Sequence, residues 1–67
     1  MKLEELFEIV SDEQEVRLIG DAFDEIKGFK STMEAVLSAA ILSMRVDCVE
    51  ASFEGELKVW VKDDAAD

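Results

Sequence analysis

The densest set of candidate metal ligands is the carboxylate cluster of Asp21, Asp24 and Glu25. Calcium loops place their acidic ligands at alternating positions and need a glycine for the sharp turn. The segment Asp21-Ala22-Phe23-Asp24-Glu25 has neither feature. The sequence therefore predicts weak cation binding at most, and no specific metal site.

Nucleophilic and acid–base chemistry has little support in the residue types. The chain has no histidine, which is the usual general base and the commonest metal ligand. Its one cysteine, Cys48, falls in the middle of a predicted strand, where a structural thiol is expected rather than a nucleophile. No glycine-rich phosphate loop and no Gly-x-Ser-x-Gly elbow occurs. We therefore expect no enzymatic activity and no cofactor.

Acidic residues dominate the chain, with seventeen acids against seven bases and a net charge of −10 in 67 residues. Such a charge disfavours direct binding to nucleic acid or to an anionic membrane, and favours a basic partner. The N-terminus turns acidic at once and lacks the apolar region of a signal peptide. No apolar run approaches the roughly 20 residues that span a bilayer. These features, with the lone thiol, predict a cytoplasmic protein.

The acids gather in the N-terminal part, where Arg17 is the only base among nine of them. If the first helix and the first hairpin lie side by side, these nine acids form one surface. An acidic surface of that kind can occupy a cleft that otherwise holds a phosphate backbone; the alternative is an ordinary solvated face. The predicted partner-binding acids are Glu4, Glu5, Glu8, Asp12, Glu13, Glu15, Asp21, Asp24 and Glu25.

The elements that position these residues follow from the apolar spacing. Leu3, Leu6, Phe7 and Val10 predict one face of a helix. Short strands are expected at 15–19 and 25–29, with a turn at Gly20-Asp21. Ser31 begins a Ser-x-x-Glu capping box, and an apolar stripe at helical spacing then runs from residue 33 to residue 44.

Residues 45–62 alternate on both sides of Gly55 and predict a β-hairpin. Two three-residue loops, 53–55 and 54–56, give the same faces, and the first suits glycine better. The face expected to pack on the capped helix carries Val49, Ala51, Leu57, Val59 and Val61. The other carries Val46, Cys48, Glu50, Lys58, Trp60 and Lys62.

Trp60 and Val46 are a candidate interface on that second face, because an exposed Trp is a common interface anchor. The alternative is that the N-terminal helix covers Trp60 through Leu6, Phe7 and Val10. Together the elements predict an α+β fold in αββαββ order, with a small antiparallel sheet whose C-terminal hairpin packs on an amphipathic helix. We expect residues 1–62 to form a single domain and residues 63–67 to form a disordered acidic tail.

The acidic amphipathic start, residues 3–10, and the closing hairpin, residues 46–61, resemble the small acidic proteins encoded by phages and other mobile elements. Some such proteins are anti-CRISPR inhibitors, and several of those resemble nucleic acid in charge. The resemblance implies a small acidic inhibitor, a DNA mimic, of a basic, nucleic-acid-handling host protein in the host cytoplasm. The alternative is a self-associating structural or assembly protein, a homodimer in its simplest form, without inhibitory activity.

Overall fold

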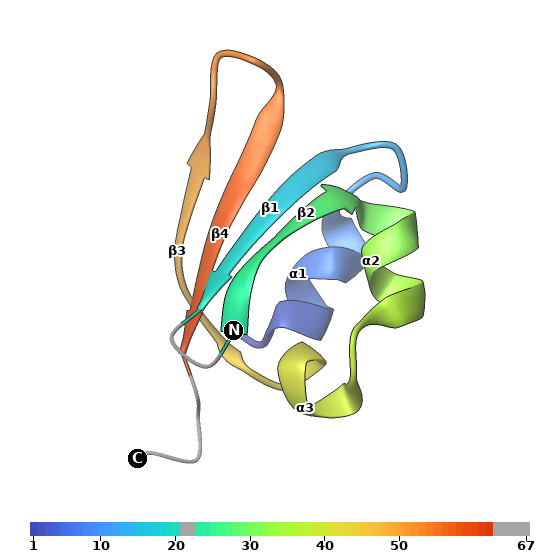
Figure 1. Ribbon diagram of the computed structural model, residues 1–67, viewed down its shortest axis with the longest axis vertical. Helices are drawn as coiled ribbons and strands as arrows, with labels where there is room; N and C mark the ends of the chain where they lie inside the picture. The colour runs from blue at the N-terminus through green and yellow to red at the C-terminus, as the bar shows by residue number, and fades with distance from the viewer. Residues whose placement is uncertain (21–22, 63–67) are drawn as a thin grey trace.

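A four-stranded sheet with three short helices forms the domain (Figure 1). The computed structural model describes residues 1–20 and 23–62. The elements are α1 (Leu3–Ile9), β1 (Glu15–Gly20), β2 (Phe23–Phe29), α2 (Lys30–Val36), α3 (Ala39–Leu42), β3 (Arg45–Ala51) and β4 (Glu56–Lys62). The α+β class and the predicted order are confirmed, except that the second helix is in two pieces.

The strand order in the sheet is β2-β1-β4-β3, so the first and last strands of the chain are central neighbours. Both hairpins are antiparallel, but β1 and β4 run parallel. The sheet is therefore mixed, and the prediction of a purely antiparallel sheet is wrong. A parallel pair needs a long crossover, and the segment through α2, α3 and β3 supplies it.

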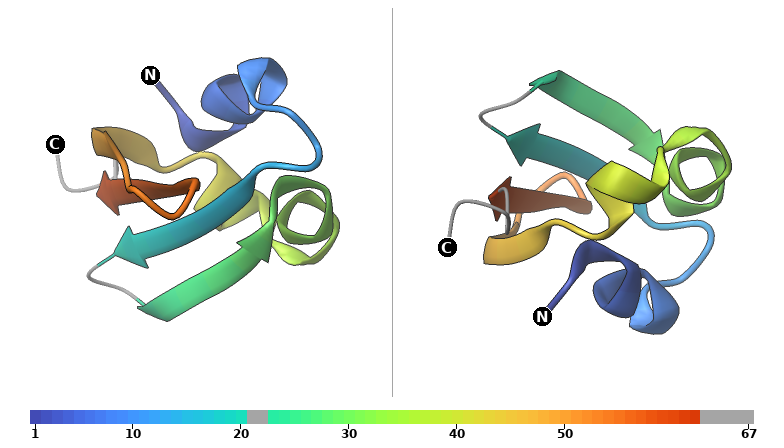
Figure 2. Two further views of the ribbon diagram at one scale, coloured as in Figure 1. Left: turned by 90° about the horizontal axis from the view of Figure 1, so that it is seen from above. Right: turned by 90° about the horizontal axis from the view of Figure 1, so that it is seen from below.

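The hydrophobic core lies between the helices and one face of the sheet. Figure 2 shows the three helices on the same side of the strands. The core consists of Leu3, Leu6 and Phe7 from α1, Met33 from α2, Val16 and Leu18 from β1, and Val59 and Val61 from β4. Every second residue of the two central strands is thus buried against the helices. The remaining residues of these strands point to the opposite side, which we call the open face.

The second predicted helix ends earlier than its apolar stripe. The N–H of Leu37 closes the last turn of α2 on the carbonyl of Met33, and Ser38 then begins α3 by accepting a hydrogen bond from the N–H of Ile41 at 3.3 Å. Serine favours such N-cap positions over helix interiors. The break therefore falls at a serine that the stripe alone does not mark.

The predicted capping box at Ser31 is wrong, because Ser31 lies inside α2 and Phe29 is the N-cap. The first backbone donors of the helix are satisfied by the segment before β1 instead. The N–H groups of Lys30 and Ser31 donate to the carbonyls of Gln14 and Asp12, at 2.9 and 3.3 Å. A tertiary contact has thus replaced the local cap.

The register of the C-terminal hairpin is confirmed for the loop at residues 53–55. Ala51 pairs with Leu57, and Glu50 pairs with Lys58. Gly55 has a φ of 84°, the left-handed conformation expected there. The N–H of Ser52 donates to the carbonyl of Glu56 at 2.9 Å and closes the loop.

Three side chains of this hairpin lie differently from the prediction. A bulge between Val46 and Cys48 places Val46 opposite Val61, where it packs against the core and not on the Trp60 face. Val49 and Ala51 were expected in the core and are exposed, Val49 by 43%. Both belong to β3, an edge strand, and the core lies over the two central strands.

Two further predictions concern the C-terminal tail and the absence of a membrane-spanning segment. The predicted acidic tail, residues 63–67, lies outside the described residues. Within residues 1–20 and 23–62, every helix is too short to cross a bilayer.

Candidate functional site

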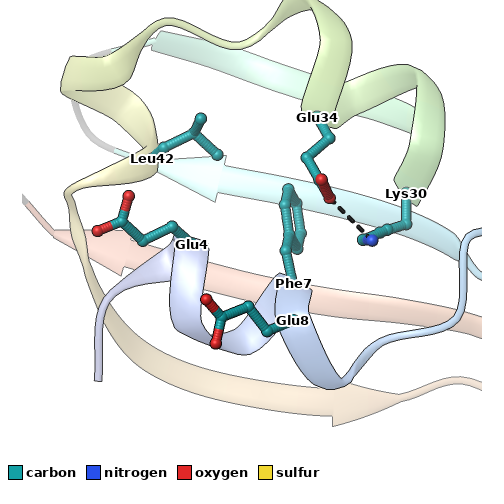
Figure 3. Close-up of a pocket in the computed structure, with 6 residues that line it drawn as sticks. All are labelled: Glu4, Phe7, Glu8, Lys30, Glu34 and Leu42. Carbon is teal, nitrogen blue, oxygen red and sulfur yellow. Dashed lines mark ion pairs between the residues drawn. The ribbon is translucent and has the colours of Figure 1, made fainter.

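The acids of α1 line the outer surface of the helical layer. Glu4 and Glu8 are exposed on α1, and Glu34 faces them from α2. Figure 3 shows Phe7 pointing from α1 into the space toward α2, with Glu4 and Glu8 on the same helix and Glu34 on the other. They rim a hollow of about 250 Å³, whose lining is completed by Lys30 and Leu42. The hollow is thus apolar at its base and acidic at its edge.

Glu5 and Asp12 have local structural contacts as well. The carboxylate of Glu5 accepts a hydrogen bond from the N–H of Lys2 at 2.8 Å, which satisfies a donor at the start of α1. Asp12 lies in the segment between α1 and β1 and pairs with Lys30, Oδ1 to Nζ at 2.8 Å. Both residues therefore help to fix the surface to which they contribute charge.

Lys30 is the buried cation of this layer, 8% exposed at the start of α2. Its Nζ lies 2.8 Å from Asp12 Oδ1 and 2.8 Å from Glu34 Oε2. The hydrogen bonds to Asp12 and then Glu34 raise the pKa of Lys30 above its ordinary value, against the opposing effect of burial. The sequence prediction missed this residue, and the i,i+4 spacing of Lys30 and Glu34 was the available signal.

Charge is unevenly divided between the two layers. The helical layer, residues 1–14 and 30–44, carries six acids and only two bases, and Lys30 is enclosed by two of those acids. We call the exposed surface of this layer the acidic helical face. Its acids are Glu4, Glu5, Glu8, Asp12, Glu13 and Glu34.

The predicted acidic surface is divided by the sheet. Glu15 lies on the open face, because its neighbour Val16 is buried against the helices. Glu25 lies there too, paired with Arg17. Asp24 is exposed beside the irregularity in β2, and Asp21 lies outside the described residues. Five of the nine predicted acids therefore share the acidic helical face, and Glu15 and Glu25 of the first hairpin lie on the open face.

Arg17 holds two carboxylates on the open face. Its Nε lies 2.7 Å from Glu25 Oε1 and 2.9 Å from Glu56 Oε1. The Nε–H makes no hydrogen bond to either oxygen, but the Nη2 group of Arg17 donates a hydrogen bond to Glu56 Oε2 at 3.4 Å. Glu56 is only 5% exposed and also lies 4.0 Å from Lys27 Nζ. No pattern in the sequence indicates that this glutamate is buried.

Trp60 is also on the open face, in the paired position beside Ile19 of β1. Both side chains are half-buried, and neither packs against the hydrophobic core. The alternative that the N-terminal helix covers Trp60 is therefore wrong, because α1 packs on the other side of the sheet. Cys48 pairs with Trp60 from β3 and is exposed.

Metal ligands do not converge in the part of the chain that the structure describes: no group of three or more His, Cys, Asp or Glu residues there is placed to hold an ion. The predicted weak cation cluster includes Asp21, which lies outside that part. Comparison with protein-family models, with curated proteins and with solved structures found no match to this chain.

Proposed function

We propose that this protein is a small acidic binding module that engages a basic, nucleic-acid-handling protein through its acidic helical face. The observation that carries the proposal is the uneven division of charge. Six acids with two bases lie on the helical layer, whereas five of the seven bases lie on the strands. A partner with a positive cleft is therefore drawn to one side of the molecule.

The arrangement of this face suits a groove that holds a phosphate backbone. Glu4 and Glu8 are one helical turn apart on α1, and Glu34 stands opposite on α2. The two α1 carboxylates present negative charge at the spacing of one helical turn, and Glu34, paired with Lys30, adds a third carboxylate across the hollow. The mode of action is inhibition by occupancy, of the anti-CRISPR type that the resemblance to small phage proteins implies.

A purified RNA-guided CRISPR nuclease is the probe that tests the proposal. Binding of the wild-type protein is measured by interferometry at about 50 and 200 mM salt, with and without duplex DNA. We expect binding to weaken as salt rises and to be displaced by DNA. Binding that ignores both salt and DNA would contradict the proposal.

Matched charge reversals locate the surface. Glu8→Lys on the acidic helical face and Glu54→Lys in the hairpin loop change the net charge equally, and both side chains are exposed. We expect Glu8→Lys to weaken binding by about fivefold, the upper range for one exposed ion pair, and Glu54→Lys to leave it nearly unchanged. Glu4→Lys/Glu8→Lys should weaken it further. Equal effects of the two single variants would show that only net charge matters.

A further inference from the structure

The open face differs in charge from the rest of the molecule. Its described residues include five bases and five acids, although the whole chain carries −10. The bases are Arg17, Lys27, Arg45, Lys58 and Lys62, and the acids are Glu15, Glu25, Asp47, Glu50 and Glu56. A neutral face is the one place where two copies of so acidic a protein meet without strong repulsion.

The charges on this face are also ordered along the strands. Glu15 pairs with Glu56 at one end, and Lys62 pairs with Arg45 at the other. Glu15 and Lys62 are exposed. The two ends are six residues apart on β4, roughly 20 Å at the rise of a strand. Among the described residues, one end of the face is therefore acidic, and the other has a net positive charge although Asp47 lies 3.8 Å from Lys62 Nζ.

Two rows of opposite character lie between these ends. Lys27, Arg17 and Lys58 form a basic row across β2, β1 and β4, in which Arg17 is ion-paired with Glu25 and Glu56. Glu50 ends this row on β3. Ile19 and Trp60 begin an apolar row that Cys48 completes on β3. Consider two copies face to face, related by a twofold axis that runs between them at right angles to the strands and level with Val59. This axis places the acidic end of each copy over the basic end of the other, and each row over the opposite row. The basic row of one copy therefore lies over the apolar row of the other, where a basic side chain can stack on Trp60 in a favourable cation–π arrangement.

We propose that the open face binds a second copy of this chain, face to face, about a twofold axis that crosses the strands. In this dimer Glu15 of each copy lies near Lys62 of the other, and Trp60 is covered by the partner's basic row. The dimer does not depend on the acidic helical face, which remains exposed on both sides.

The area of the open face limits how tightly two copies can bind. Four strands about 4.8 Å apart, of six or seven residues each, cover roughly 450 Å². Specific interfaces of standard size bury about 800 Å² per partner. The proposed dimer is therefore weak and exchanges rapidly, with a dissociation constant of roughly tens to hundreds of micromolar.

Sedimentation equilibrium between about 5 and 500 µM tests the dimer, because this range brackets the expected dissociation constant. We expect a wild-type monomer at the low end and a dimer at the high end. Glu15→Lys and Lys62→Glu should each weaken the dimer by about tenfold, because each contact occurs twice. Glu15→Lys/Lys62→Glu should restore it, since the exchanged charges again meet.

Glu8→Lys is the matched control, because it makes the same charge change on the acidic helical face. We expect it to leave the dimer intact or to strengthen it slightly by lowering the net charge. The proposal is overturned if the wild type stays monomeric at the highest concentration, if the double variant remains as weak as the single ones, or if Glu8→Lys weakens the dimer as much as Glu15→Lys. If the wild type is monomeric, the open face does not bind a second copy and is available to a partner of another kind.

Discussion

Ile19 of β1 and Trp60 of β4 are paired neighbours across the parallel centre of the sheet, on the side that no described helix covers. Val59, the next residue on β4, is fully buried on the other side. One side of β4 thus packs in the hydrophobic core, and the other side belongs to the open face. Residues on the core side of the sheet stabilise the fold, whereas residues on the open face are available for binding.

The first prediction compares two truncations on these opposite faces. Leu18→Ala removes a fully buried side chain and should lower the free energy of unfolding by about 2–5 kcal/mol. Trp60→Ala removes a larger side chain but should cost less, about 1 kcal/mol, because Trp60 is outside the core. Urea denaturation at micromolar protein concentration, where the monomer prevails, measures both. A larger loss for Trp60→Ala would place that residue in the folding core.

The second prediction concerns the tip of the C-terminal hairpin. Gly55 has a φ of 84°, and open space surrounds the position of an added Cβ. Gly55→Ala should therefore destabilise the protein by about 1–2 kcal/mol through backbone strain alone. Glu54→Ala, beside it in the same loop, is the control and should change stability by less than about 0.5 kcal/mol. Equal unfolding midpoints for the two variants in urea would contradict the strained loop.

The third prediction concerns a steric contact at the end of β1. A Cβ added at Gly20 would lie 2.7 Å from two ring carbons of Phe23 and 3.3 Å from a methyl carbon of Val61. Gly20→Ala should cost about 1–3 kcal/mol, the usual range for overpacking. Phe23→Leu should relieve part of that cost, so a double-mutant cycle in urea should show favourable coupling. Strictly additive losses would mean that Phe23 is not the obstacle.

The fourth prediction follows from the raised pKa of Lys30. A group whose pKa is higher in the folded state adds stability that is fully present below its unfolded pKa, about 10.4 for lysine. That contribution is lost as the pH rises through the folded pKa. Lys30→Met lacks the charge, so the stability difference between wild type and variant should be constant from about pH 7 to 10 and should shrink above it. Denaturation curves at several pH values measure this difference, and one that grows in alkali would contradict the ion-pair account.

The elements with local signals were predictable from the sequence. Gly55 between two alternating runs is sufficient to give the hairpin, its loop and its register. The apolar spacing of Leu3, Leu6 and Phe7 likewise gives the buried face of α1. In both cases the determining interactions lie within a few residues of one another.

The features that were missed depend on distant contacts. The parallel pairing of β1 with β4 joins residues some forty positions apart, such as Ile19 and Trp60, and no local pattern encodes it. Val49 alternates like a core residue, but its exposure is set by the place of β3 at the sheet edge.

The candidate site was predictable only in part. The excess of acid and the cluster on α1 are evident from composition and spacing. The separation of Glu15 and Glu25 from that cluster required the orientation of β1 and β2, because the strands carry them to the open face. Lys30 was overlooked because its partner Asp12 lies eighteen residues away.

We propose that the acidic helical face, rather than the open face, meets a basic partner. Amide chemical-shift mapping by NMR, with unlabelled RNA-guided nuclease added to labelled protein, tests it directly. We predict that shifts and broadening concentrate in residues 4–13 and at Glu34, and that they are lost in Glu4→Lys/Glu8→Lys. Changes concentrated instead in residues 15–19 and 56–62 would contradict the account.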